Sequence, residues 1–166
     1  STAFGCSIEG IVSEEKVIEI AERVMLMGVD EVCLSDTAGY GNPRQVQRLA
    51  QGIWARCGRE ALRSIHLHNT RGQGLANALM AVEIGITTID SSLGGIGGCP
   101  SAPGASGNIV TEDLVFLLES MGINTGIDLR ELLAVRNQVA QALPQEQLYG
   151  FTAAAGLPLG FDSVDP

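Results

Sequence analysis

Apolar residues along the chain follow two alternating patterns. In five stretches they recur three and four positions apart, as is typical of helices with one buried face. These stretches cover residues 13–27, 43–58, 74–83, 111–121 and 129–142, and residues 143–166 have no clear period. Short apolar runs bounded by polar or glycine-containing turns predict strands over residues 30–35, 62–68 and 86–90, and the tail of a strand over residues 1–4. The alternation predicts an α/β fold with a parallel sheet.

Capping residues support several of the helix boundaries. Ser13 precedes the first helix as a predicted N-cap, and Glu14 and Glu15 stand in the first turn, where acidic side chains suit the positive end of the helix dipole. Pro43 occupies a favoured early position of the second helix. Thr111 is predicted to cap the fourth helix in the same way.

Two architectures contain such a sheet, a doubly wound sheet and a (β/α)₈ barrel. No G-x-G-x-x-G motif follows a first strand, so the fingerprint of a dinucleotide-binding fold is missing. A complete barrel needs eight strands and at least about 200 residues. The 166 residues of this chain predict four strands, which is about half of a barrel.

Composition and charge narrow the function classes. The net charge of −9 argues against nucleic acid and anionic membranes as partners. No apolar run reaches the ~18 residues that would suggest a membrane span. The cysteines are Cys6, Cys33, Cys57 and Cys99, and no C-x-x-C pair suggests a zinc ribbon. Their wide spacing favours a reducing compartment, and the apolar run around Cys33 predicts that this residue lies in the core.

Polar residues follow three of the predicted strands at their carboxyl ends. They are Asp36 and Thr37, His66 and His68, and Asp90 and Ser91. In a parallel barrel these ends share one face, and that face holds the active site. The spacing therefore predicts a site at these strand ends.

His66 and His68 are the only histidines and lie two residues apart on a strand. Residues with this spacing share a face of the strand, so both imidazoles can bind one divalent cation, with Asn108 adding an oxygen. The alternative is one histidine that bonds to the backbone and one that is exposed. Asp36 is either a proton carrier, a carboxylate that supports the metal ligands, or the cap of the next turn. Asp90 either bonds to turn amides or supports the metal ligands.

Residues 87–108 lead from the last predicted strand into a loop with six glycines, and Cys99 lies in the middle of it. Glycine allows the backbone to approach a ligand closely. A cation bound nearby would lower the pKa of the thiol enough for chemistry. The alternative is a surface loop that contains a cysteine by chance.

Several motifs together resemble the 3-hydroxy-3-methylglutaryl-CoA lyase family, and the resemblance covers nearly all of residues 1 to about 130. They are STAFGC, LSDTAG, HLHNT, GGIGGCP, ASGN and TEDLVFLLESMGI. The resemblance implies a (β/α)₈ barrel with extra C-terminal helices. This chain would be its C-terminal half, about strands 5–8, with barrel elements in residues 1–110 and C-terminal helices and tail in residues 111–166.

The same resemblance implies a site. His66, His68 and Asn108 match metal ligands for Mg²⁺ or Mn²⁺, and Cys99 and Asp36 match catalytic residues. Gly97, Gly98 and Thr37 are the corresponding substrate-binding candidates. The implied reaction is retro-Claisen cleavage of 3-hydroxy-3-methylglutaryl-CoA to acetoacetate and acetyl-CoA. The acyl-CoA substrate and a second copy in a dimer of the full-length enzyme are the implied partners. The implied location is the bacterial cytoplasm or the mitochondrial matrix.

One departure from the family is large. The family's first strand carries an Arg beside a metal-binding Asp, and neither matches a position in this chain. The chain by itself is therefore expected to be inactive or nearly so. An aldolase or condensing synthase on a similar barrel, and a non-catalytic half-barrel interaction module, are the alternative hypotheses.

Overall fold

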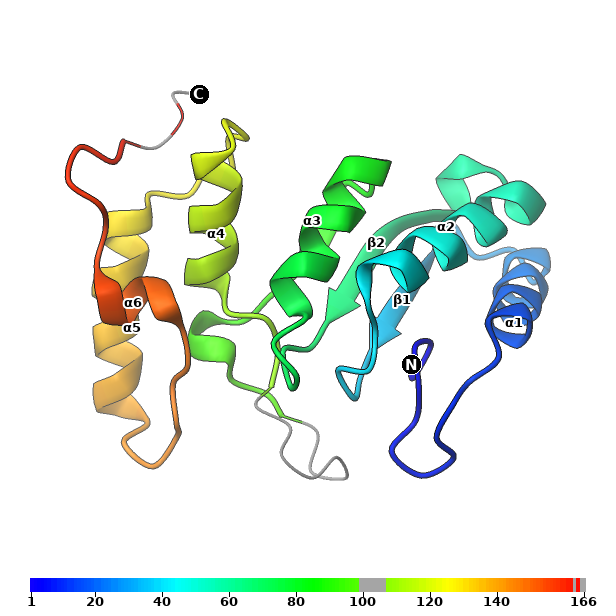
Figure 1. Ribbon diagram of the computed structural model, residues 1–166, viewed down its shortest axis with the longest axis horizontal. Helices are drawn as coiled ribbons and strands as arrows, with labels where there is room; N and C mark the ends of the chain where they lie inside the picture. The colour runs from blue at the N-terminus through cyan, green and yellow to red at the C-terminus, as the bar shows by residue number, and fades with distance from the viewer. Residues whose placement is uncertain (99–106, 163, 165–166) are drawn as a thin grey trace.

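The computed structural model describes residues 1–98, 107–162 and 164. Within these residues the helices are α1 (Glu14–Leu26), α2 (Pro43–Cys57), α3 (Gly74–Ile84), α4 (Thr111–Ser120), α5 (Leu129–Ala142) and α6 (Phe151–Ala155). The strands are β1 (Val32–Asp36), β2 (Leu62–Leu67) and β3 (Thr88–Asp90), and the short 3₁₀ turns are η1 (Arg59–Ala61) and η2 (Leu93–Gly95). Figure 1 shows α2 in front of β1 and β2, α1 and α3 on either side of α2, and α4, α5 and α6 grouped beyond α3.

The three strands form a parallel sheet in the order β1-β2-β3. The predicted alternation of strands and helices is thereby confirmed. Residues 1–4, predicted as the tail of a strand, are not in one. Only the Ala3 amide bonds to β1, donating to the Ser35 carbonyl at 3.0 Å, and a ladder needs consecutive bonds of this kind.

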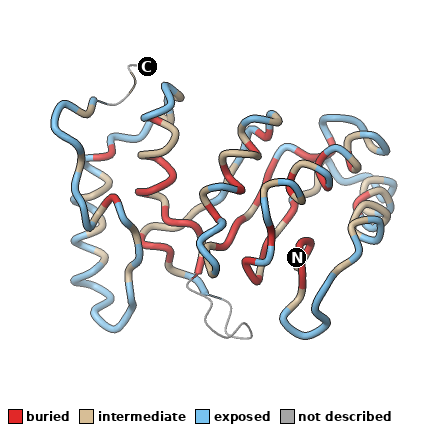
Figure 2. The backbone as a smooth tube through the Cα atoms, viewed as in Figure 1, coloured by how far each residue is buried: buried red, intermediate tan, exposed pale blue. Residues whose placement is uncertain are grey.

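The helices cover one face of the sheet. Leu34, Ile65 and Leu67 point to that face and form a single buried cluster with apolar residues of α1, α2 and α3. Figure 2 shows the burial along the strands and the inner sides of these helices, whereas α5 is mostly exposed. A doubly wound sheet has helices on both faces. One-sided coverage is the arrangement of a (β/α)₈ barrel wall.

The opposite face of the sheet is more open and more polar. Register pairs Ser35 with His66 and His66 with Asp90, so these three side chains form one row across the strands. Cys33 lies on this face and is exposed, so the prediction of a core cysteine is wrong. The apolar run around it indicates a strand but does not determine which face each residue occupies.

The C-terminal helices are held together by buried acidic side chains. Asp113 in α4 accepts hydrogen bonds from the amides of Phe151 and Thr152 at 3.0 and 2.7 Å, which caps α6. The sequence pattern misses α6 because its cap comes from a residue almost 40 positions away. Thr111 is the first residue of α4 rather than its cap, because its hydroxyl pairs with Ser91 at 2.9 Å instead. Among the described helices, none is long and apolar enough to cross a lipid bilayer.

Candidate functional site

The two histidines meet at the carboxyl end of β2. Their Nε2 atoms are 3.2 Å apart, and the ring centroids are separated by 5.1 Å. His68 is buried, and His66 is half-buried. Burial lowers the pKa of His68, and the neighbouring His66 lowers it further. A neutral imidazole is the form that binds a metal ion, so the pair is suited to sharing a cation between its rings.

Asn108 is brought to this pair by a short backbone ladder. The Asn69 amide donates to the Gly107 carbonyl at 3.1 Å, and the Ile109 amide donates to the Leu67 carbonyl at 3.0 Å. His68 and Asn108 consequently face each other across an isolated antiparallel bridge. The ladder joins residues about 40 positions apart in the sequence, and it places the amide beside the histidines.

The orientation of the Asn108 side chain is fixed by the Ile96 carbonyl. That carbonyl accepts hydrogen bonds from Asn108 Nδ2 at 2.8 Å and from Ser92 Oγ at 2.6 Å. With its nitrogen engaged, Asn108 keeps Oδ1 free. Among the described residues, this buried oxygen and the buried His68 Nδ1 have no hydrogen-bond partner. Buried polar atoms are normally satisfied, and the unpaired Asn108 oxygen is an acceptor suited to a cation.

The carboxylate of Asp90 lies beside Nδ1 of His66, the ring nitrogen that does not face His68. Asp90 Oδ2 lies 3.5 Å from His66 Nδ1, and the two residues are paired in register between β2 and β3. A carboxylate at the remote ring nitrogen fixes the tautomer and orientation of a metal-binding histidine. The alternative in which Asp90 only bonds to turn amides finds no such bond among the described residues.

Glycines allow the loop ends to approach one another closely. Gly97 has a φ of +109°, and a Cβ there would lie 2.8 Å from Asn108 Nδ2. At Gly107, with a φ of +100°, a Cβ would collide with the Gly95 carbonyl oxygen. A side chain at Gly97 would therefore disturb Asn108 itself, and one at Gly107 would push that residue away from Gly95. Gly98 is exposed, and Cys99 lies outside the described residues.

Asp36 is placed differently from the histidines. Its carboxylate accepts hydrogen bonds from the amides of Tyr40 and Gly41 at 2.8 and 3.0 Å. It pairs in register with Leu67, so it belongs to the helix-covered face, whereas His66 belongs to the open face. Burial raises the pKa of Asp36 even though the bound amides oppose that shift. The turn-capping alternative is therefore what the geometry shows, and a role in proton transfer stays a prediction.

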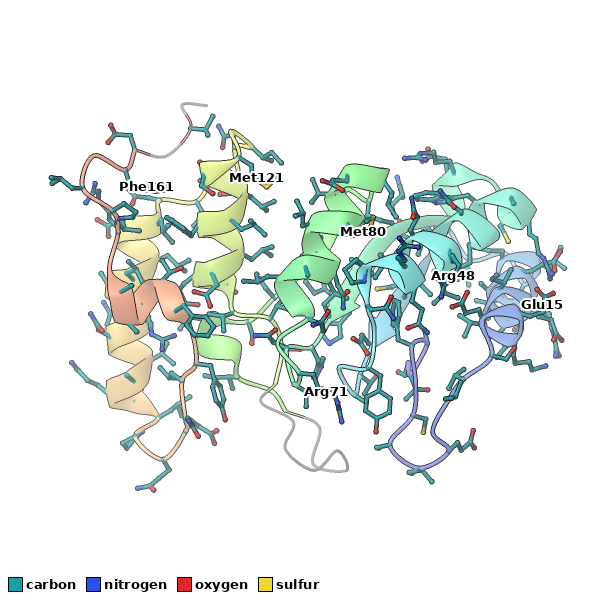
Figure 3. The ribbon with its side chains drawn as sticks, viewed as in Figure 1. Glu15, Arg48, Arg71, Met80, Met121 and Phe161 are labelled. Carbon is teal, nitrogen blue, oxygen red and sulfur yellow. The ribbon has the colours of Figure 1, made fainter. Side chains whose placement is uncertain are left out.

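Thr37 and Arg71 border the site. Thr37 Oγ1 accepts a hydrogen bond from the Thr2 amide at 3.0 Å. Arg71, labelled in Figure 3 below the strand ends, donates to the Ala38 and Gly39 carbonyls at 3.0 and 3.3 Å. Its guanidinium carbon lies 4.4 Å from the centre of the Tyr40 ring. The arginine thus braces the turn that follows β1.

The structure therefore brings His66, His68, Asn108 and Asp90 together and leaves Asp36 in its turn. Within residues 1–98 and 107–162, no group of three or more His, Cys, Asp or Glu side chains is arranged to hold a metal. The donor set is two imidazoles and one amide oxygen. Sequence reasoning missed Ser92, whose hydroxyl helps fix the amide. Nothing in the local sequence distinguishes it from an ordinary turn serine.

Comparison with known proteins places these residues in a family. The family model described as HMGL-like matches residues 1–139. Human mitochondrial hydroxymethylglutaryl-CoA lyase is 46% identical over 143 residues, which are 86% of this chain and 44% of that protein. The hydroxymethylglutaryl-CoA lyase YngG of Bacillus subtilis is 41% identical over 158 residues, which are 93% of this chain and 52% of that protein.

A solved structure gives the same result. An HMG-CoA lyase of Acinetobacter baumannii, in complex with coenzyme A and 3-methylmalate, superposes with a TM-score of 0.87 at 42% identity. The match covers 99% of this chain and 53% of that one. This chain thus spans about half the length of the proteins that it matches.

Proposed function

The chain belongs to the HMGL-like family, and from that premise we propose that it carries the metal-binding strand ends of a carbon–carbon lyase. The proposed reaction is cleavage of 3-hydroxy-3-methylglutaryl-CoA to acetoacetate and acetyl-CoA. The names of the relatives support this choice. The observation that carries it is the pair of facing imidazoles beside the unpaired Asn108 oxygen.

We propose that the chain contributes about strands 5–8 of a (β/α)₈ barrel and that β1, β2 and β3 are three of these strands. The one-sided helix cover supports this assignment. The division into barrel elements in residues 1–110 and C-terminal helices and tail in residues 111–166 follows from it. The open row of Ser35, His66 and Asp90 would then face the barrel interior.

The donors fit a divalent cation such as Mg²⁺ or Mn²⁺. His66, His68 and Asn108 would hold it, since two neutral imidazoles and an amide oxygen suit several such ions. When bound, the cation supplies Lewis-acid stabilisation of charge that develops on substrate oxygens. The facing Nε2 atoms of the two histidines and the unpaired Asn108 Oδ1 are the reason for expecting an ion at this position.

The reaction itself moves one proton. The tertiary hydroxyl loses its proton, the bond between C2 and C3 breaks to leave acetoacetate, and C2 of the acetyl thioester takes up a proton. We propose Cys99 and Asp36 as the groups that carry protons. Burial raises the pKa of Asp36, which favours its protonated form. Asp90 holds the ring of His66 in place throughout.

For the acyl-CoA substrate we propose contacts with Gly97, Gly98 and Thr37. Gly97 and Gly98 are exposed and expose backbone at the edge of the site. The Thr37 hydroxyl accepts a bond from the Thr2 amide and lies 3.5 Å from Ser35 Oγ, and its proton can be donated to Ser35 or to a ligand. The full-length enzyme is proposed to be a dimer that binds neither nucleic acid nor membranes, consistent with the net charge of −9. The relatives include mitochondrial and cytoplasmic forms, and we propose the bacterial cytoplasm or the mitochondrial matrix.

A chimeric enzyme tests the function. In the Bacillus subtilis lyase, the matching segment is replaced by this chain, and acetyl-CoA and acetoacetate are measured with Mg²⁺ or Mn²⁺ present. Cleavage is expected in the chimera and is expected to be lost with His66→Ala. A folded chimera that does not cleave the thioester would contradict the proposal.

Asp90→Asn is expected to weaken Mn²⁺ binding about 10- to 100-fold, because groups that orient a histidine ligand typically contribute that much. The substitution keeps the shape of the side chain but removes its charge. The matched control is Asp30→Asn at an exposed position away from the site. Electron paramagnetic resonance of free Mn²⁺ gives both affinities. Equal affinities in the two variants would mean that Asp90 does not support the site.

A further inference from the structure

A buried ion pair links the C-terminal helices to the loop beside the site. Glu112 in α4 is fully buried, and the Arg136 side chain in α5 is 13% exposed. Arg136 Nη1 lies 2.6 Å from Glu112 Oε1. Removing two charges from water costs several kcal/mol for each ion, so such a pair is weak evidence for stability alone. The polar groups that it binds show what else it does.

The backbone amide and carbonyl of Gly94 are both hydrogen-bonded, the amide to Glu112 and the carbonyl to the Tyr149 backbone. The Gly94 amide donates to both carboxylate oxygens of Glu112, at 3.0 and 3.2 Å. The Gly94 carbonyl accepts a hydrogen bond from the Tyr149 amide at 2.8 Å. Arg136 Nη1 also donates to the Tyr149 carbonyl at 2.8 Å. The carboxylate, the guanidinium and the Tyr149 backbone thus fasten η2 at its centre.

The backbone conformation of Gly94 and the atoms packed around it leave no room for a side chain. Its φ is +64°, and a Cβ there would lie 3.1 Å from Arg136 Nη1 and 2.9 Å from Leu148. A residue with a side chain would strain the backbone and push the arginine away. The turn is therefore built around contact with the ion pair.

The fastened turn leads directly to Asn108. Ile96 is two residues beyond Gly94, and its carbonyl holds the Asn108 amide nitrogen at 2.8 Å. We infer that Glu112 and Arg136 are positioning residues that act through η2 and Ile96 to hold the Asn108 side chain in the orientation that leaves Oδ1 unpaired, opposite His68. This inference rests on the proposed metal site, but the orientation of the amide can be measured without a metal.

The experiment compares three variants of the full chain. Arg136→Met removes both donated bonds. Arg136→Lys retains a cationic donor, and one nitrogen suffices because Nη1 alone makes both contacts. Arg130→Met is the matched control, because Arg130 is on the same helix and its side chain, among the described residues, bonds to the Phe161 carbonyl alone. Phe161 is labelled in Figure 3 at the upper end of α5.

The first readout is the hydrogen exchange and chemical shift of the Asn108 side-chain amide by NMR, without metal. Faster exchange and a shifted signal are expected in Arg136→Met, and wild-type behaviour is expected in Arg136→Lys and Arg130→Met. The second readout is Mn²⁺ affinity, which is expected to fall about 10-fold in Arg136→Met only.

An unchanged Asn108 amide in folded Arg136→Met would overturn the inference. If the amide responds as expected but the unsubstituted chain does not bind Mn²⁺, the positioning inference stands and the proposed metal site fails. If Arg136→Met does not fold, hydrogen exchange in the unsubstituted chain tests the inference instead. The amides of Gly94, Tyr149 and the Asn108 side chain are then expected to open with the same free energy. An Asn108 amide that opens independently would contradict the inference.

Discussion

Replacing His68 with alanine is expected to weaken Mn²⁺ binding by at least ~100-fold. Groups that only orient a ligand account for about 10- to 100-fold, and His68 is proposed to be a ligand itself. Its loss leaves His66 as the only histidine, and one imidazole with one amide oxygen holds a hydrated cation poorly. Free Mn²⁺, measured by electron paramagnetic resonance during a titration of the chain, gives the affinity.

A control separates this loss from a general disturbance of the fold. Asn124→Ala truncates an exposed residue whose side-chain oxygen, within the described part of the chain, accepts a bond from the nearby Gly126 amide alone. It is expected to bind Mn²⁺ like the unsubstituted chain. Asn108→Ala is expected to fall between this control and His68→Ala, since an amide oxygen is a weaker donor than an imidazole for Mn²⁺. If His68→Ala retains wild-type affinity, the facing imidazoles are not a metal site.

The parts of the site that were predictable from sequence are those set by local geometry. A spacing of two on a strand puts His66 and His68 on one face, and their Nε2 atoms do lie 3.2 Å apart. The position of Asp90 beside them follows from the parallel register of β2 and β3. Strand period and sheet direction are short-range properties, so a sequence pattern reports them well.

The parts that were not predictable depend on distant contacts. The free Asn108 oxygen results from the Ile96 carbonyl, and Ile96 follows a turn fastened by Arg136, more than 40 positions from Gly94. Glu112 looks like an ordinary acidic residue of a first helical turn, although it is fully buried. The burial of a charged residue and the identity of its partner do not repeat along the sequence, so no sequence pattern shows them.

The two faces of the sheet explain why the site can be polar without weakening the core. Ile65 and Leu67 in β2 are buried against the helices, while His66 between them points to the open face. The alternation of a strand assigns packing to one set of residues and chemistry to the other. By register, Asp36 lies on the face that packs against the helices, although it carries a carboxylate. The role of Asp36 is therefore the most informative to test.

Asp36→Ala is expected to destabilise the chain by about 2–6 kcal/mol. Two backbone amides, those of Tyr40 and Gly41, would lose their acceptor, and an unsatisfied buried donor costs about 1–3 kcal/mol. Asp36→Asn keeps one accepting oxygen and is expected to cost about half as much. Urea unfolding of both variants measures the difference. A loss below about 1 kcal/mol in Asp36→Ala would show that the carboxylate does not hold the turn.

The pH dependence of the unfolding free energy of the same variants shows whether Asp36 is a buried, protonated acid or an ionised cap of the turn. Burial raises the folded-state pKa of Asp36 above its unfolded value of about 3.9. Protonation of Asp36 therefore adds stability that is fully present below the unfolded pKa and is lost as pH rises through the folded pKa. The difference in unfolding free energy between the unsubstituted chain and Asp36→Asn should decrease over this window, because asparagine does not titrate. A constant difference would mean that folding does not shift the pKa of Asp36, and a difference that rises with pH would mean that the fold holds Asp36 ionised, as a pure turn cap would be. In either case the proposed proton-carrying role would rest on Cys99 alone.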